Sequence, residues 1–161
     1  MPAGSRMRTA DELRDAVEAH LRSLPLHAEL GGLEEALRYP LETGGKRVRP
    51  VLCLAVADAL GAPPDAALPG ACAVELVHTF SLVHDDLPAL DDDAERRGRP
   101  SAHVAFGEGV AILAGDALLA EAFRLALGYP TTTVAAELAD AVLGMIAGQY
   151  RDITASDDDL E

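Results

Sequence analysis

The chain has 161 residues, 49% of them apolar, which is the length and composition of one globular domain. Its 13 cationic and 27 acidic residues give a net charge of −14. This charge argues against a protein that binds nucleic acid or that is held on an anionic membrane by its charge.

Helix signals follow one another along the chain, and no segment shows the alternation of a strand. The 30 alanines and 24 leucines also favour helix. Thr9 and Glu12 form a capping box, which begins a helix that ends near Ser23. Further helices are predicted over about 29–38 (closed by Pro40), 49–60, 66–87, 107–127 and 132–152, with loops over 42–48 and 91–100. The sequence therefore predicts a single all-α domain over residues 1–161.

Two of the predicted helices, 66–87 and 107–127, are apolar on almost all faces. Such helices belong at the centre of a large bundle, and this chain has few helices to wrap them. We therefore expect that the chain forms a dimer or is part of a longer protein. Asp116 interrupts the second of these helices and is expected to make a structural hydrogen bond to a nearby helix end.

The expected location is the cytoplasm, without stable membrane insertion. Residues 1–10 hold no apolar stretch of signal-peptide length, and no apolar run reaches the roughly 20 residues that span a bilayer. Cys53 and Cys72 lie in apolar helical pattern and are expected to be buried free thiols in a reducing compartment.

A basic segment, Gly44-Gly45-Lys46-Arg47-Val48-Arg49-Pro50, precedes the helix predicted over 49–60. Glycines let a backbone approach a ligand, and a helix N-terminus together with cations favours phosphate oxygens. The alternative is a solvated basic turn. Three of the 13 cations of an acidic chain fall in four positions here, which favours phosphate binding.

An acidic segment, 85–93, holds five aspartates and is followed at once by Arg96, Arg97 and Arg99. Carboxylates suit Mg²⁺, which fills its shell with substrate phosphate and water. Asp85 and Asp91 are about 240° apart on an ideal helix, so they converge only if the helix breaks at Pro88. The alternative is a solvated acidic loop with arginine counter-ions.

Two side chains lie close to the helical stripe of Asp85: His78, seven residues earlier, and Ser81, four residues earlier. We expect these three residues to line one wall, although a histidine in a helix is often only a core residue. Gln149 and Asp152, three residues apart in the last helix, form a weaker polar signal.

Together these segments resemble the trans-type prenyl diphosphate synthases, which make farnesyl and geranylgeranyl diphosphate. The resemblance spans roughly residues 30–161 and rests most on the Asp85–Asp91 block with its arginines. It implies an all-α helical bundle around a central cavity, which joins isopentenyl diphosphate head to tail to an allylic diphosphate. It also implies Mg²⁺ as the cofactor and a homodimer as the assembly.

The resemblance assigns roles to individual residues. Asp85 and Asp91 would hold Mg²⁺ bridged to the allylic diphosphate, with Asp86 close by, and Arg96 would hold that diphosphate. The isopentenyl diphosphate would be held by Lys46, Arg49, His78 and Arg97. Gln149 and Asp152 match a polar pair at the cavity wall. Arg47 and Arg99 are expected at the surface.

Product length in this family is set by bulk near the first aspartate. Phe80 and Ser81 lie five and four residues before Asp85. The aromatic at the first of these positions resembles the short-chain type that makes a C15 product, although ideal helix geometry puts Phe80 at the flank of the cavity. The alternatives are C10 and C20.

The sequence also departs from the family, whose members are about twice as long. The second aspartate-rich motif is absent, and Asp157-Asp158-Asp159 does not have its surroundings. The chain is therefore expected to be truncated, to bind one diphosphate weakly and to turn over poorly. Three other classes stay open: a non-catalytic synthase-like subunit, a terpene cyclase, and a structural dimerisation module.

Overall fold

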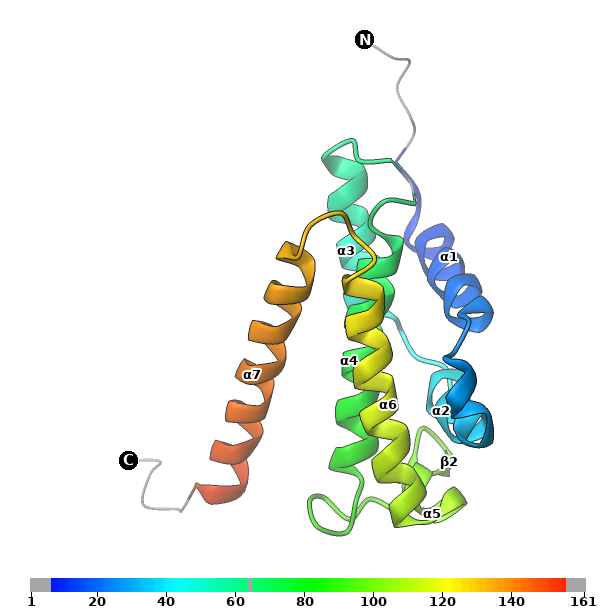
Figure 1. Ribbon diagram of the computed structural model, residues 1–161, viewed down its shortest axis with the longest axis vertical. Helices are drawn as coiled ribbons and strands as arrows, with labels where there is room; N and C mark the ends of the chain where they lie inside the picture. Colours follow the sequence, from blue (N-terminus) through cyan, green and yellow to red (C-terminus); the bar gives the residue numbers. More distant parts are fainter. Residues whose placement is uncertain (1–6, 64, 156–161) are drawn as a thin grey trace.

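In the computed structural model, which describes residues 7–63 and 65–155, helices make up nearly all of the regular structure (Figure 1). The elements are α1 (Ala10–Ser23), a 3₁₀ helix η1 (Ala28–Leu33), α2 (Glu34–Glu42), α3 (Val48–Ala59), α4 (Leu68–Asp85), β1 (Glu95–Arg96), β2 (Arg99–Pro100), α5 (Ala102–Phe106), α6 (Glu108–Ala126) and α7 (Thr133–Thr154). The prediction of an all-α chain is confirmed. Asp157, Asp158 and Asp159 lie outside the described residues.

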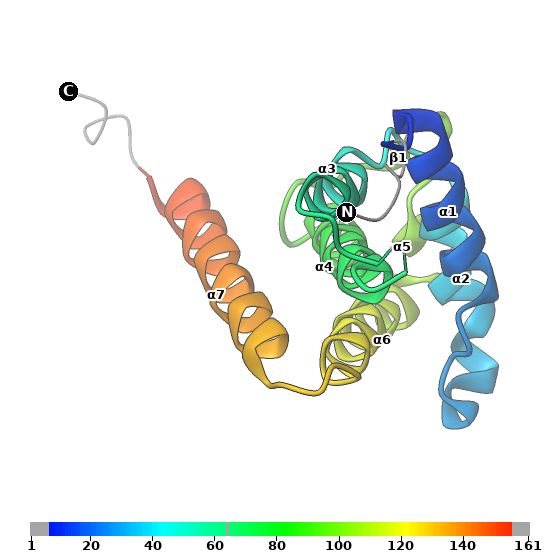
Figure 2. The same cartoon turned by 90° about the horizontal axis from the view of Figure 1, so that it is seen from above.

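The helices form a bundle with α4 at its centre. Figures 1 and 2 show α4 beside α6, with α1 and α2 on one side and α7 on the other. The core contains fully buried leucines from several helices, among them Leu37, Leu54, Leu76 and Leu118. This arrangement places α4, which carries His78, Phe80, Ser81 and Asp85, in contact with α3, α6 and α7.

The closest pair of helices, α4 and α6, is possible because Gly115 has no side chain. A Cβ atom at Gly115 would lie 2.2 Å from Nε2 of His84, which is 3.0 Å from the carbonyl oxygen of Ile112. Asp116 was expected to need a structural hydrogen bond, and that prediction is wrong. Its side chain is 62% exposed, with Oδ1 3.9 Å from Nε2 of His84, so water solvates the carboxylate.

Both predicted ends of α1, the capping box and Ser23, are confirmed, whereas the predicted end of the second helix is displaced. The capping box forms, since the Glu12 amide donates to Oγ1 of Thr9 (3.2 Å) and the Thr9 amide donates to Oε2 of Glu12 (2.7 Å). Pro40 does not close the second helix but lies inside α2, where the Thr43 hydroxyl donates to the Pro40 carbonyl (2.8 Å) and extends the last turn.

The loop predicted over 91–100 contains a small antiparallel hairpin, in which Glu95 pairs with Pro100 and Arg96 with Arg99. Its two turn residues, Arg97 and Gly98, both have positive φ (56° and 78°), as a type I′ hairpin turn requires. Strands of two residues carry no readable alternation, which is why the sequence pattern missed them.

Exposed apolar side chains gather on α3 and α7 rather than on α4. In the described part of the chain no large apolar residue of α4 is exposed, whereas Val110, Ile112 and Leu113 of α6 are, so the expectation that both apolar helices lack cover holds for α6 and is wrong for α4. On α3 the exposed set is Val48, Leu52 and Val56, which lie four residues apart, and Leu60 continues it. On α7 the exposed set is Leu143, Ile146, Tyr150 and Ile153.

None of the described helices combines the length and the hydropathy that crossing a bilayer requires.

The two cysteines are free, as predicted. Cys72 is buried, and burial raises the pKa of its thiol to about 12. Cys53 is half-buried, and burial raises its pKa as well. Both thiols are therefore protonated and unreactive at neutral pH.

Candidate functional site

The glycine-rich segment forms a turn between α2 and α3, and a pocket of about 490 Å³ opens beside it. Gly44 adopts a left-handed conformation (φ 77°), which a glycine takes without steric cost. The pocket is lined by Gly45, Lys46, Arg47, Val48, Arg49, Glu75, His78 and Arg97. The four residues that the resemblance assigns to isopentenyl diphosphate therefore line one pocket, which we call the cationic pocket.

Contacts between three elements shape the cationic pocket. Nη1 of Arg49, at the start of α3, lies 3.5 Å from Nε2 of His78 on α4. The guanidinium of Arg97, in the hairpin turn, donates to the carbonyl of Gly44. It also covers Gly45, where a Cβ atom would lie 2.5 Å from Nη1 of Arg97. The glycine and the arginine thus bring the hairpin against the basic turn.

The charge of the cationic pocket comes from its lysine and arginines. Burial lowers the pKa of His78, and the neighbouring Arg49 lowers it further. At neutral pH the imidazole is therefore neutral and offers a hydrogen bond rather than a charge.

Arg47 was expected at the surface, and that prediction is wrong. The residue is only 3% exposed. Its Nε donates to Oε1 of Glu18 (2.7 Å) and its Nη1 to Oε1 of Glu75 (2.7 Å). Glu75, on the buried face of α4, was missed in the sequence. Its signal was available, since a carboxylate within an apolar helical stretch needs a buried cation. Arg99 lies outside the pocket, 4.2 Å above the ring of Tyr39.

The acidic segment turns back on itself where α4 ends. The helix stops at Asp85, and the amide of Asp91 donates to the carbonyl of Asp85 (2.8 Å). The expected break between these residues is therefore confirmed. Burial raises the pKa of Asp85, and the negative charge of Asp91 raises it further. Two carboxylates that repel each other in this way favour a bound cation.

Another acidic residue of this segment, Asp86, forms an internal ion pair with Arg96. It is 2% exposed and accepts from Nε of Arg96 at 2.8 and 2.9 Å. Arg96 is also 3.6 Å from Asp93. Asp86 therefore holds the guanidinium of Arg96 in place at the start of the hairpin.

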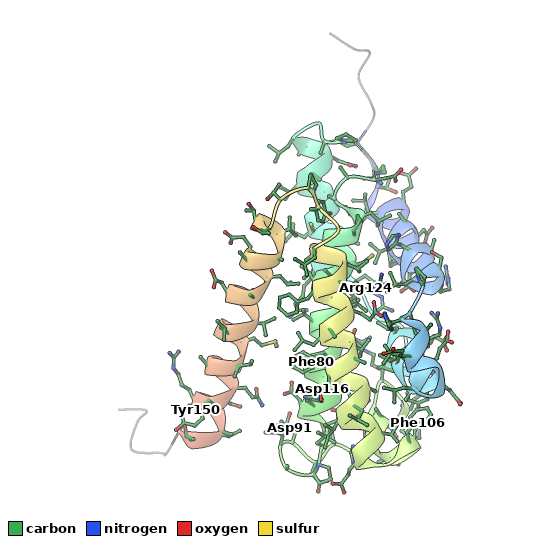
Figure 3. The ribbon with its side chains drawn as sticks, in the orientation of Figure 1. Phe80, Asp91, Phe106, Asp116, Arg124 and Tyr150 are labelled. Atoms are coloured by element: carbon green, nitrogen blue, oxygen red, sulfur yellow. The ribbon has the colours of Figure 1, made fainter. Side chains whose placement is uncertain are left out.

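A second, more apolar cavity of about 290 Å³ lies between α4 and α7. Its lining is Phe80, Ser81, His84, Asp85, Leu90, Met145, Ile146, Gln149, Tyr150 and Ile153. Figure 3 shows Phe80 on α4, Tyr150 near the end of α7 and Asp91 in the turn below α4. We call this space the apolar cavity; among the described residues, Asp85 is the one acidic side chain that lines it.

The predicted wall of His78, Ser81 and Asp85 is only partly formed. Ser81 and Asp85 line the apolar cavity, whereas His78 lines the cationic pocket. Seven residues place His78 about 10 Å along the helix axis from Asp85, so a shared stripe does not mean a shared cavity. Gln149 lines the apolar cavity, but Asp152 is exposed and does not line it.

The described residues contain no group of three or more His, Cys, Asp or Glu side chains placed to hold a metal ion. Asp85 and Asp91 offer two carboxylates at the end of α4. Mg²⁺ commonly takes one or two carboxylates from a protein and completes its shell with phosphate oxygens and water. The pair therefore fits a magnesium ion that arrives with a phosphorylated ligand.

Comparison with known proteins shows that this chain is similar to polyprenyl synthetases. The polyprenyl synthetase family model matches residues 31–161. The chloroplastic large subunit 1 of a heterodimeric geranylgeranyl pyrophosphate synthase from Arabidopsis thaliana is 47% identical over 149 residues, which cover 86% of this chain and 40% of the relative. A farnesyl diphosphate synthase of Bacillus subtilis is 44% identical over 133 residues, covering 76% of this chain and 45% of the relative.

Solved structures agree with this placement. The crystal structure of a geranyltranstransferase from Thermotoga maritima matches with a TM-score of 0.83 at 37% identity, over 89% of this chain and 54% of that chain. This chain therefore spans about half the length of the proteins that it matches.

Proposed function

Because this chain belongs to the polyprenyl synthetase family, we propose that it acts in the head-to-tail condensation of isopentenyl diphosphate with an allylic diphosphate, either dimethylallyl or geranyl. The observation that carries the proposal is the pairing of two sites on α4. The cationic pocket contains His78 and the apolar cavity contains Asp85, about 10 Å apart along one helix. One enzyme that joins two diphosphates needs two such sites.

The two sites hold their diphosphates by different means. In the cationic pocket Lys46, Arg49 and Arg97 supply positive charge, and His78 supplies a hydrogen bond to the isopentenyl diphosphate. At the acidic end Asp85 and Asp91 would hold Mg²⁺, and Arg96, fixed by Asp86, would reach the same allylic diphosphate. Bound Mg²⁺ supplies positive charge that stabilises the departing diphosphate.

The apolar cavity offers an apolar wall to the reacting carbons. The allylic chain would lie against Phe80 and Ile146, whose side chains replace water on that side of an allylic cation. Diphosphate leaves C1 of the allylic chain, the isopentenyl double bond attacks the resulting allylic cation, a C–C bond forms, and the new cation loses a proton to the released diphosphate. This chemistry requires no protein nucleophile, in keeping with the protonated thiols of Cys53 and Cys72.

We further propose that the product is farnesyl diphosphate. Phe80 is 8% exposed, lines the apolar cavity and packs edge-on to His84 with ring centroids 4.8 Å apart. A fixed aromatic in the wall limits the length of chain that fits, with Ser81 as its smaller neighbour. The relatives carry the names of both farnesyl and geranylgeranyl synthases, which supports the C20 product as the first alternative. A C10 product is the second.

The assembly and the cellular location of the protein are proposed as well. We propose a homodimer, supported by the exposed apolar side chains Val110, Ile112 and Leu113 on α6. The relative named as a heterodimeric large subunit supports the alternative, a synthase-like subunit that needs a different partner. A cytoplasmic location is supported by the two free thiols.

Turnover by the 161-residue chain tests the proposal. The chain is incubated with Mg²⁺, isopentenyl diphosphate and geranyl diphosphate, and the dephosphorylated products are identified by mass. We expect slow formation of farnesol at best, because the second aspartate-rich motif of the family is absent from this chain. EDTA should abolish any product. A sample that is helical by circular dichroism, forms no product and binds neither diphosphate would contradict the proposal.

A further inference from the structure

A buried arginine in the wall of the cationic pocket, Arg47, links three helices. The guanidinium of Arg47 donates to Glu18 on α1 and to Glu75 on α4, and its Nη2 donates to the carbonyl of Leu41 on α2. The side chains of Arg47 and Glu75 are 1% and 4% exposed, and that of Glu18 is 25% exposed. Burial lowers the pKa of Arg47, but the hydrogen bonds to Glu18 and Glu75 outweigh it and raise the pKa overall. The group is therefore a permanent cation within the fold.

The backbone at Arg47 is held in a conformation that it would not adopt alone. Arg47 precedes α3 and has φ 48° and ψ 36°, in the left-handed region. Residues other than glycine rarely occupy this region unless their surroundings hold them there. No side chain caps the start of α3, and the Val51 amide donates to the Arg47 carbonyl (3.0 Å). The side-chain contacts of Arg47 are thus what fixes this turn.

The turn that Arg47 fixes carries two groups of the cationic pocket. Lys46 precedes it directly and Arg49 follows two residues later, and both line the pocket. On α4, Glu75 lies one turn before His78, which approaches Arg49. One ion pair therefore sets the basic turn against the helix that forms the opposite wall.

We propose that Arg47 is a positioning residue, whose contacts with Glu18 and Glu75 hold Lys46 and Arg49 in the orientation in which they bind the diphosphate of isopentenyl diphosphate. This inference rests on the proposed function, since it concerns the same pocket. The guanidinium of Arg47 is buried and does not itself bind the substrate. Its effect passes through the backbone of residues 45–49.

Two measurements on the 161-residue chain test this role. Hydrogen exchange followed by mass spectrometry reports the order of residues 44–49 without any ligand. Calorimetric titration with isopentenyl diphosphate in EDTA reports the affinity of the cationic pocket. In Arg47→Gln we expect exchange in this segment to become at least about 10-fold faster and the dissociation constant to rise at least about 10-fold, a loss typical of a displaced charged hydrogen-bonding group.

Arg38→Gln is the matched control. Arg38 donates to Glu34 (2.7 Å) and to the carbonyls of Arg22 and Leu24, yet it lies outside the cationic pocket. This variant should lose contacts of the same kind while exchange over 44–49 and the affinity stay unchanged. If Arg47→Gln loses its helical circular dichroism signal, Arg47→Lys takes its place, with the same direction of change expected.

A double variant separates position from charge. Without Arg47 the carboxylate of Glu75 is left uncompensated near the bound diphosphate, and Arg47→Gln with Glu75→Gln removes that charge. A positioning role predicts that the affinity stays low in the double variant. Recovery of the affinity, or unchanged exchange in Arg47→Gln, would overturn the inference. If the unaltered chain binds no isopentenyl diphosphate, the proposed function fails, and exchange over 44–49 still decides the role of Arg47.

Discussion

The basic turn at 44–49 and the acidic turn at 85–93 both border α4, but their charges are balanced in different ways. In the basic turn, Arg47 is paired with Glu18 and Glu75, while Lys46 and Arg49 face a pocket. In the acidic turn, Asp86 is paired with Arg96. Burial raises the pKa of Asp85, and the negative charge of Asp91 raises it further. In each turn one charged residue, Arg47 or Asp86, forms an internal ion pair, and other charged residues stay available to bind a ligand. The basic turn is ready for an anion, whereas the acidic turn first needs a cation.

The largest expected effect is that of Asp85→Asn. We expect it to weaken Mg²⁺-dependent binding of geranyl diphosphate at least about 100-fold, the scale of losing one key electrostatic group in a site. Binding of isopentenyl diphosphate in EDTA should change less than about 2-fold. Calorimetric titration of both ligands measures the difference, and Asp116→Asn, on an exposed carboxylate, is the control.

The same variant should also be more stable without metal. The pKa of Asp85 is raised in the folded chain, so the folded state binds the carboxyl proton more tightly than the unfolded state does. As pH rises through the raised pKa this proton is lost, and the charged carboxylate then lowers the stability of the folded chain. At pH 7 and in EDTA we therefore expect Asp85→Asn to unfold at a higher temperature than the unaltered chain. The gap should close below about pH 4, where the carboxyl is protonated in both states. A lower unfolding temperature at pH 7 would contradict the repulsion between Asp85 and Asp91.

Phe80→Ala should change the length of chain that the apolar cavity accepts. Removing the ring lengthens the cavity between α4 and α7, so we expect farnesyl diphosphate to gain about 10-fold in affinity relative to geranyl diphosphate. Competition titrations with Mg²⁺ measure this ratio without requiring turnover. Phe106→Ala is the matched control, since this ring also packs edge-on to an aromatic, Tyr39, at 5.2 Å, but lies away from the cavity. If the ratio of the affinities for farnesyl and geranyl diphosphate is unchanged in Phe80→Ala, Phe80 does not limit product length.

Gly45→Ala should affect the basic turn alone. The added Cβ atom would lie 2.5 Å from Nη1 of Arg97, so the guanidinium must move and lose its hydrogen bond to Gly44. We expect the affinity for isopentenyl diphosphate to fall about 5-fold, less than tenfold because only one flexible cation is displaced. Gly109→Ala, where a Cβ atom meets nothing within 4 Å, should leave the affinity unchanged. Equal losses in both variants would contradict the role of Arg97.

The smallest expected effect is a pH dependence of the cationic pocket. Burial and Arg49 lower the pKa of His78, so the imidazole gains its proton only on the acid side of its ordinary range. Arg96 and Arg97 oppose this protonation and Glu75 favours it. Because a bound diphosphate favours the charged form, affinity should rise about 2- to 3-fold between pH 7.5 and 5.5 relative to His78→Asn. If the ratio of the two affinities, unaltered chain to His78→Asn, does not change between pH 7.5 and 5.5, His78 does not face the ligand.

Much of the fold and of the candidate site can be predicted from the sequence, because the sequence signals for these features are local. The capping box at Thr9, the helical periodicity and the break at Pro88 each depend on a few neighbouring residues. The grouping of Lys46, Arg49 and His78 in one pocket is implied by the resemblance to the prenyl diphosphate synthases, and the chemistry of the basic segment by itself predicts only an anion. Here the structure adds distances to an expected picture.

The rest depends on contacts between distant segments. Arg47 is indistinguishable from its basic neighbours in the sequence, and only the fold brings it to Glu18 and Glu75. The hairpin at 95–100 has strands too short to show alternation, although it places Arg97 over Gly45. His78 and Asp85 share a helical stripe, yet axial distance and the position of α7 divide them between two cavities. Periodicity gives the face of a helix but not what covers that face.

The most direct test of the account compares the metal requirement of the two sites. The 161-residue chain is titrated with isopentenyl diphosphate and, separately, with geranyl diphosphate, each in Mg²⁺ and in EDTA. We predict that isopentenyl diphosphate binds in both conditions, with an affinity that falls as salt is added, whereas geranyl diphosphate binds in Mg²⁺ and not in EDTA. If both ligands require Mg²⁺, or if neither does, then the division of α4 into a cationic and an acidic diphosphate site is wrong.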